Sequence, residues 1–146
     1  MTEDDITQHI IDMLGGGHFV IAGDNSFFFR GAHDKVPFAT IVTKDGELDT
    51  ASNLNRAGVF RLDISIGQQS FLALFGEQEP VTVDYAALDR LMPHPVHARM
   101  HWVSVINPSE KTFETVKPLL VQAHNADPQQ ASRPTFSLQQ APSIRS

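Results

Sequence analysis

Three histidines stand close together in a pattern that is able to bind a metal ion. His94, His97 and His101 fall within eight residues of the segment "LMPHPVHARMHWVSVIN", which spans residues 91–107. Three neutral imidazoles and a water molecule can hold Zn²⁺ in a tetrahedral site. The four-residue spacing of His97 and His101 places both rings on one face only if the segment between them is helical.

The residues around these histidines do not favour that helix. Pro95 disfavours the helical conformation at His94, and residues 102–106 have the composition of a buried strand. No neighbouring Asp or Glu offers a fourth ligand. We therefore favour neither a metal nor any other cofactor, and interpret the segment as a connector between a helix and a core strand. In this interpretation His94 locks a turn, His101 is a partly buried ring on the strand, and His97 is exposed.

Arg61 and Asp63 form a second polar pair with possible chemistry. In "GVFRLDISIG", residues 58–67, the apolar side chains alternate with Arg61 and Asp63, so the two charges share the opposite face of a strand. They either bind a ligand or are simply solvated or paired with each other. Solvated or paired charge is favoured over a ligand role, because such surface pairs usually mean little. A ligand site requires convergence in one pocket. Its candidate residues are Arg56, Arg61, Asp63, His94, His101 and Trp102.

No catalytic residue is predicted. The sequence has no cysteine, which excludes thiol catalysis, thiolate metal sites and disulfides. It also lacks the G-x-S-x-G motif of a nucleophile elbow. The composition therefore favours a protein without enzymatic activity.

The charge distribution disfavours nucleic acid as the main partner. The formal net charge is −6, and the eleven Lys and Arg residues are scattered, whereas phosphate binding needs clustered cations. A nucleic-acid-binding protein remains an alternative if Arg56, Arg61 and Arg99 gather on one basic face. The acidic N-terminal residues do not resemble a signal peptide, and no apolar run approaches the roughly 18 residues of a membrane span. We expect no membrane partner and a cytoplasmic location.

Hydrophobic periodicity predicts a single α+β domain over residues 1–126, followed by a disordered tail over 127–146. Its antiparallel sheet of about five strands packs with three to four helices. Asp84 is expected to cap a helix that ends near Met92, Asn107 to cap the last helix, and Pro118 to kink or split that helix. The predicted strands lie in 18–23, 26–31, 36–46, 58–67 and 101–107, and the predicted helices in 3–14, 68–75, 84–92 and 107–125.

Several strings resemble a family of bacterial proteins of unknown function. They are "PFATIVTKD", "GVFRLDISIG", "PHPVH" and "HWVSVINPSEKT", and the resemblance covers most of residues 1–126. More distantly, the strand that follows His101 and the capped helix after it resemble the MmcQ/YjbR-like proteins. That resemblance implies a small α+β double-wing fold, for which DNA binding is proposed. It implies no catalytic residue.

The leading hypothesis is a small binding or interaction module with no assignable reaction. Its partner is unknown, with a protein or a small molecule favoured. The expected partner face lies near the polar side of the sheet and residues 94–102. Two alternatives stay open, namely a nucleic-acid-binding protein of the double-wing type and a metal-dependent enzyme with His94, His97 and His101 as ligands.

Overall fold

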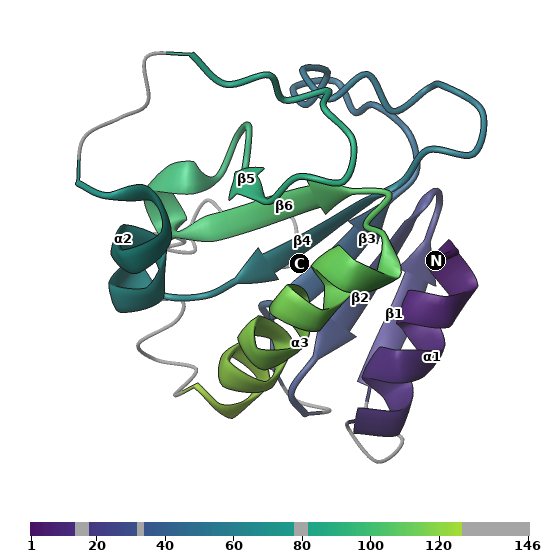
Figure 1. The fold of residues 1–146 in the computed structure, drawn as a ribbon. Helices are drawn as coiled ribbons and strands as arrows, with labels where there is room; N and C mark the ends of the chain where they lie inside the picture. The colour runs from purple at the N-terminus through teal and green to yellow at the C-terminus, as the bar shows by residue number, and fades with distance from the viewer. Residues whose placement is uncertain (14–17, 32–33, 78–81, 127–146) are drawn as a thin grey trace.

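The computed structural model describes residues 1–13, 18–31, 34–77 and 82–126, which form one antiparallel sheet and three α-helices (Figure 1). The sheet has six strands in the order β1-β2-β3-β4-β6-β5. The predicted α+β class is therefore confirmed, with one strand more than expected. The strands are β1 (His18–Ala22), β2 (Asn25–Phe29), β3 (Ala39–Val42), β4 (Arg61–Ser65), β5 (Met92–Pro93) and β6 (Trp102–Ile106). The helices are α1 (Glu3–Met13), α2 (Gln68–Phe75) and α3 (Glu110–Asn125), with a 3₁₀ helix η1 (Ala98–Met100).

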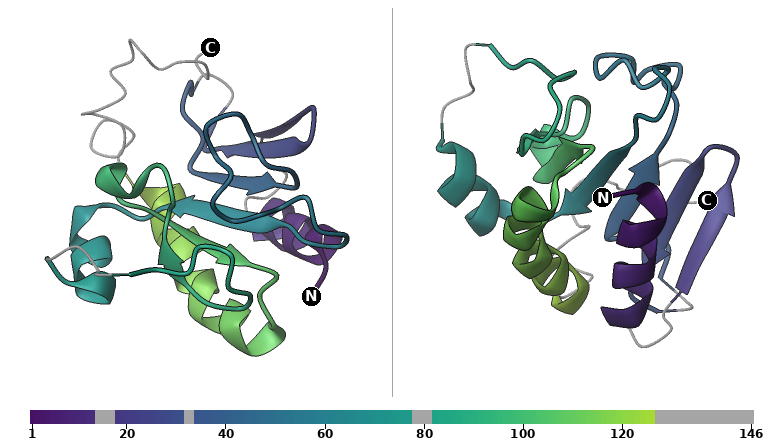
Figure 2. Two further views of the ribbon diagram at one scale, coloured as in Figure 1. Left: turned by 90° about the horizontal axis from the view of Figure 1, so that it is seen from above. Right: turned by 45° about the vertical axis from the view of Figure 1, so that its right-hand side comes forward.

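One face of the sheet is apolar and is covered by α1 and α3 (Figures 1 and 2). Strand alternation directs Leu62 and Ile64 of β4 toward this face. They join one hydrophobic cluster with residues from both helices, including Ile6 of α1 and Val116 of α3. The cluster is the main core of the domain.

The other face of the sheet is polar and is covered by loops instead of helices. A long segment over residues 43–60 connects β3 to β4, and a second irregular segment over 82–91 leads to β5. Leu54, Met92 and Ile106 form a small second hydrophobic cluster beneath these segments. All five residues of β4 are buried, because helices cover one side of the strand and loops cover the other. The second face of this strand is polar, as the alternation predicts, and it is buried beneath the loops.

Two predicted helix features are wrong. Residues 84–91 form turns instead of a helix, because the Asp84 side chain accepts the backbone N–H of Ala86 and stabilises a local turn. Ser109, rather than Asn107, caps α3 by accepting the N–H of Thr112. The Asn107 side chain instead accepts the N–H of Phe60 and donates to the carbonyl of Gly58, outside the helix.

The remaining elements follow the sequence patterns closely. The hairpin β1–β2, the helix α2 that ends before Gly76, and the strand β6 are all present. Pro118 does not split the last helix, which runs continuously from Glu110 to Asn125. The predicted tail over 127–146 lies outside the described residues.

Candidate functional site

Arg61 is fully buried and holds two carboxylates at once. Its position in β4 directs the side chain onto the loop-covered face of the sheet. Nε and Nη2 donate to Asp63 at 2.8 and 3.1 Å, while Nη1 and Nη2 donate to Asp49 at 2.9 and 2.6 Å. Nη1 also donates to the Ser52 hydroxyl at 3.1 Å. Burial alone would lower the pKa of Arg61, but Asp63 and Asp49 outweigh burial and raise it above its usual range.

Asp63 is the acceptor at the centre of this arrangement. Besides Arg61, its carboxylate accepts hydrogen bonds from Thr40 of β3 at 3.1 Å and from Ser104 of β6 at 2.7 Å. Both hydroxyls come from residues directly opposite Asp63 in the strand register. The His94 Nε2 atom lies 3.3 Å from Oδ2. Burial alone would raise the pKa of Asp63, but the contacts with His94 and Arg61 outweigh it and hold the pKa well below its usual range.

His94 uses both of its ring nitrogens within the protein. Nδ1 accepts the backbone N–H groups of Val96 and His97, each at 2.9 Å, and so closes the turn around Pro95. An acceptor Nδ1 requires the proton on Nε2, which therefore donates to Asp63. These contacts fix the orientation of the ring against Asp63 and the turn. The sequence prediction that His94 locks a turn is correct in outcome, although the ring accepts N–H groups instead of bonding to a carbonyl.

The three histidines do not converge on one point. The His97 ring packs against His94 with centroids 4.8 Å apart, and the residue is exposed as predicted. His101 ends η1 with φ of 68° and places its ring against Phe71 of α2 at 5.4 Å. Burial of this ring lowers the pKa of His101. Among the residues that the structure describes, no group of three His, Cys, Asp or Glu side chains is arranged to hold a metal ion.

Trp102 and Arg56 support the neighbouring backbone. Trp102 is buried, meets the His94 ring edge-on at 6.4 Å and accepts the His94 backbone N–H through its carbonyl. Arg56 donates to the carbonyls of Ser52 at 3.0 Å and Ala86 at 3.1 Å, which ties the two loop segments together. Ser52 therefore links Arg56 to Arg61, through its carbonyl on one side and its hydroxyl on the other.

The six predicted ligand-binding residues are thus divided among three environments. Arg61, Asp63 and His94 form one buried polar cluster with Trp102 at its edge. His101 lines a separate hollow of about 260 Å³ with Phe71, Phe75 and Arg99. Arg56 lines a different cavity, next to the N-terminus of α1. Of these six residues, Arg56 and His101 line two different cavities, and the polar side chains of Arg61, Asp63 and His94 are buried.

Sequence reasoning missed half of the polar cluster. The alternation of "ATIV" and "WVSVI" carries a partial signal for Thr40 and Ser104, because it places Thr40 on the face opposite Ala39 and Ile41, and Ser104 on the face opposite Val103 and Val105. Asp49 and Ser52 carry no such signal. They lie in the irregular segment 43–60, and only the path of that segment brings them to Arg61.

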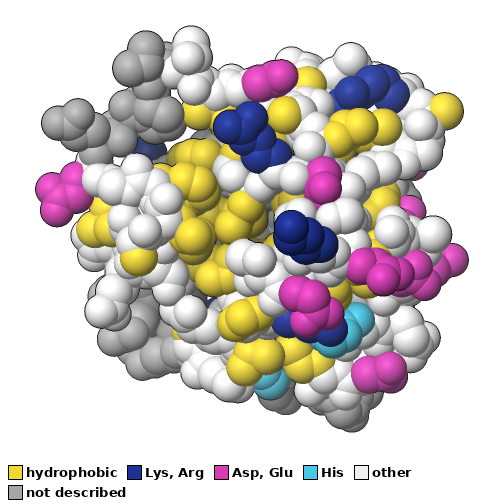
Figure 3. Space-filling model, in the orientation of Figure 1, with side chains coloured by type: hydrophobic (Ala, Val, Ile, Leu, Met, Phe, Trp, Pro, Cys, Tyr) yellow, Lys and Arg dark blue, Asp and Glu magenta, His cyan; other side chains and the backbone are white. Residues whose placement is uncertain are grey.

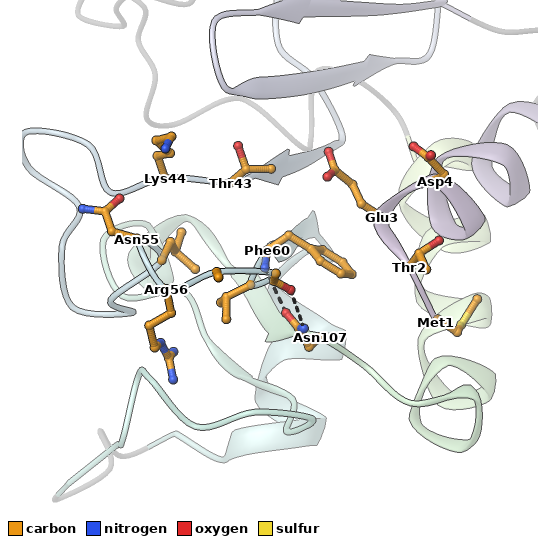
Figure 4. A pocket seen from close by; sticks show the side chains of 14 residues that line it. Met1, Thr2, Glu3, Asp4, Thr43, Lys44, Asn55, Arg56, Phe60 and Asn107 are labelled. Atoms are coloured by element: carbon orange, nitrogen blue, oxygen red, sulfur yellow. Dashed lines mark hydrogen bonds between the residues drawn. The ribbon is translucent and has the colours of Figure 1, made fainter.

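A larger cleft lies beside the cluster, between the N-terminus of α1 and the segment 43–60 (Figure 4). It encloses about 610 Å³, within the range of about 300–1,000 Å³ typical of small-molecule sites. Glu3 extends into it from α1, facing Thr43 and Phe60 (Figure 4). Sequence reasoning did not predict this cleft, because its walls come from distant parts of the chain.

The two walls of the cleft carry opposite charges. Glu3 and Asp4 lie on the α1 wall, and Lys44 and Arg56 lie on the wall formed by 43–60. Within the described ranges, neither the Glu3 carboxylate nor the Lys44 ammonium makes a hydrogen bond or ion pair. Partial burial and the neighbouring charge of Asp4 raise the pKa of Glu3. The cleft therefore offers two charged groups, Glu3 and Lys44, that have no partner in the described part of the chain.

Replacing Arg61 tests whether the buried cluster holds the fold together. Arg61→Met leaves Asp63 buried without its main counter-charge, and we expect a loss of about 3–5 kcal/mol in the free energy of unfolding, measured by urea denaturation. Arg90→Met serves as the matched control, because Arg90 is exposed. Equal stability of the two variants would contradict a structural role for Arg61.

The depressed pKa of Asp63 predicts a specific response to acid. Well above the ordinary aspartate pKa of about 4, at about pH 6 and higher, the carboxylate is charged in both the folded and unfolded states, and its full stabilisation is present. As the pH falls below about 5, the unfolded chain binds a proton that the folded state does not, so the free energy of unfolding decreases.

NMR titration of carboxyl carbons checks this directly in the folded protein. The Asp63 signal is expected to stay constant from pH 7 down to about pH 3, whereas the Glu3 signal moves within that range because its pKa is raised. If the titration midpoint of Asp63 lies at or above that of Glu3, the buried hydrogen-bond donors do not lower the pKa of Asp63.

Comparison with known proteins gives a family without an assigned reaction. No curated protein and no solved structure matches the chain significantly. A family model described as a family of unknown function (DUF6194) matches residues 1–135. The match covers the sheet, the helices, the polar cluster and the cleft. The chain therefore belongs to the DUF6194 family, a family of unknown function.

Proposed function

We propose that this chain is a binding module that holds a small zwitterionic molecule in the cleft between α1 and the segment 43–60. The observation that carries the proposal is the Glu3 carboxylate, which is partly buried, extends into the cleft and has no partner among the described residues. A bound ammonium group would pair with this carboxylate, and an anionic group at the other end would face Lys44. Charge-assisted hydrogen bonds of this kind are stronger than neutral ones.

The polar cluster supports a binding role and offers little for catalysis. Both ring nitrogens of His94 are engaged, Asp63 accepts several hydrogen bonds, and the Arg61 guanidinium is enclosed by carboxylates. A general base needs a free nitrogen or oxygen within reach of a substrate proton. The cluster instead fixes the segment 43–60 through Asp49 and Ser52, and that segment forms one wall of the cleft.

The sequence predicted a partner face near the polar side of the sheet, whereas the proposed binding site is the cleft beside α1. Thr40, Asp63 and Ser104 are buried beneath the loops, so a partner does not reach them in this conformation. The cleft lies at the edge of the same loop-covered side. A small molecule, one of the two partners favoured from the sequence, fits this location.

The geometry does not favour the nucleic-acid alternative. Arg61 is buried, and Arg56 and Arg99 line different hollows. On the face shown in Figure 3, Lys and Arg side chains stand in separate places among neutral and acidic ones. The described residues include no helix that is long and apolar enough to cross a membrane.

Three further expectations belong to the same proposal. They are a cytoplasmic location, a single domain that spans residues 1–126, and a distant relationship to the MmcQ/YjbR-like double-wing proteins. The antiparallel sheet and the strand β6 followed by the capped helix α3 are compatible with that relationship.

Ligand-observed NMR tests the proposed site. Saturation-transfer experiments with amino acids and dipeptides are expected to give signals, whereas uncharged sugars of similar size give none. Amide shifts in the labelled protein should then change at residues of the cleft, such as Thr43, Asn55 and Gly58.

Substitution of Glu3 provides the sharper test. Glu3→Gln removes the charge and is expected to weaken binding at least about tenfold, because hydrogen bonds to charged groups contribute about 1.5–3 kcal/mol. Glu47→Gln is the matched control, an exposed glutamate of the segment 43–60 that does not line the cleft. The proposal fails if no zwitterion binds, or if both variants bind equally well.

A further inference from the structure

Strand β1 has an outer edge that no described strand covers. It is the first strand in the sheet order and pairs with β2 alone, in a continuous register over all five residues. Its side chains Val20 and Ile21 are 52% and 67% exposed. The sequence HFVIA contains no proline and no Lys, Arg, Asp or Glu, and so lacks the features that usually keep edge strands from pairing with other chains.

The turn at the end of β1 determines which backbone groups point outward. Ala22 pairs with Asn25 across the two-residue loop Gly23-Asp24, and Gly23 has φ of 63°. In such a hairpin the residues that flank the loop form a hydrogen-bonded pair, and bonded pairs then alternate along the strands. Val20 therefore bonds to β2, and the N–H and C=O groups of Phe19 and Ile21 point away from the sheet.

We propose that β1 pairs with β1 of a second copy of this chain, in an antiparallel arrangement with its two-fold axis at Val20. This axis places Phe19 of each copy opposite Ile21 of the other. These are the residues whose backbone groups point outward, so each pair completes a hydrogen-bonded pair of the ladder. The two sheets become one continuous sheet across the interface.

The side chains match the same two-fold axis. Phe19 and Ile21 lie on one face of β1, so each meets its counterpart from the other copy on that face. The two Val20 side chains meet on the opposite face. The pairing covers the exposed apolar side chains of β1 and brings no charged residue of the strand into the contact. This self-complementarity favours a second copy over an unrelated peptide.

Charge and size set the strength of this contact. Helix α1 covers the β1–β2 side of the sheet (Figure 1) and carries four acidic residues, Glu3, Asp4, Asp5 and Asp12. Dimerisation therefore brings two acidic helices closer together. Because salt screens their repulsion, we expect the dimer to be tighter at high salt. Two five-residue strands bury less than the about 1,200 Å² of a standard interface. We therefore expect a weak dimer, with a dissociation constant on the order of 10–100 µM.

Sedimentation velocity of the full chain over a range of concentrations tests the proposal. The wild-type chain is expected to shift from monomer to dimer, and to do so at lower concentration in high salt. Ile21→Lys places a charge in the contact and should raise the dissociation constant at least about tenfold. Leu48→Lys is the matched control, because Leu48 is 88% exposed and lies in the segment 43–60 outside β1, and it should dimerise like the wild type.

Amide hydrogen exchange identifies the edge that is used. Phe19 and Ile21 should become protected as the concentration rises, while Val20 is protected at all concentrations by its bond to β2. A chain that stays monomeric at about tenfold above the expected dissociation range, or a dimer unaffected by Ile21→Lys, overturns the proposal. Protection of Phe19 and Ile21 in the monomer also overturns it, because the chain would then cover its own edge.

Discussion

The pairing of one buried arginine with two carboxylates organises the loop-covered side of this domain. Arg61 belongs to the sheet through β4, and so does Asp63, whereas Asp49 belongs to the long segment between β3 and β4. The guanidinium therefore joins an irregular segment to the rigid sheet through two parallel hydrogen bonds. Taking these charges out of water is costly, and good geometry with additional hydrogen bonds offsets that cost. Ser52, Thr40, Ser104 and His94 supply those bonds.

This arrangement explains why the residues with the most obvious chemistry are not the ones available to a ligand. His94, Asp63 and Arg61 direct their polar atoms at one another and at the backbone. These three residues hold the segment 43–60 and the turn after His94 in place. A loop held by a rigid framework is a common way to build a binding site. The cleft beside α1 is bounded by that framework, and the charged groups of Glu3 and Lys44 in it make no ion pair with any residue that the structure describes.

The parts of the fold that were predictable follow from short-range patterns. Strand alternation in β4 was sufficient to place Arg61 and Asp63 on one face, and glycine positions marked the ends of β1 and α2. The helix predicted at 84–92 was wrong because Asp84 bonds to a local N–H and forms a turn. The sequence pattern also predicted Asn107 as the cap of α3. Its side chain instead accepts the backbone N–H of Phe60, the residue before β4.

The candidate site was less predictable for a physical reason. Asp49 reaches Arg61 only because 18 residues of irregular chain, 43–60, fold back over the sheet, and no periodicity encodes that path. The opposing walls of the cleft are likewise about 40 residues or more apart in the sequence. The dispersal of His94, His97 and His101 follows from Pro95 and the left-handed conformation of His101, of which only Pro95 is visible in the sequence.

Amide hydrogen exchange in an Asp49→Asn variant tests the central claim most directly, that the Arg61–Asp49 contact holds the segment 43–60 in place. The amide of Leu54, bonded to Asp45 within this segment, should exchange at least about tenfold faster in the variant, because the contact no longer restrains local opening. The amides of Leu62 and Val103 in the sheet should exchange at their original rates. Unchanged exchange at Leu54, or equal acceleration throughout the sheet, would contradict the account.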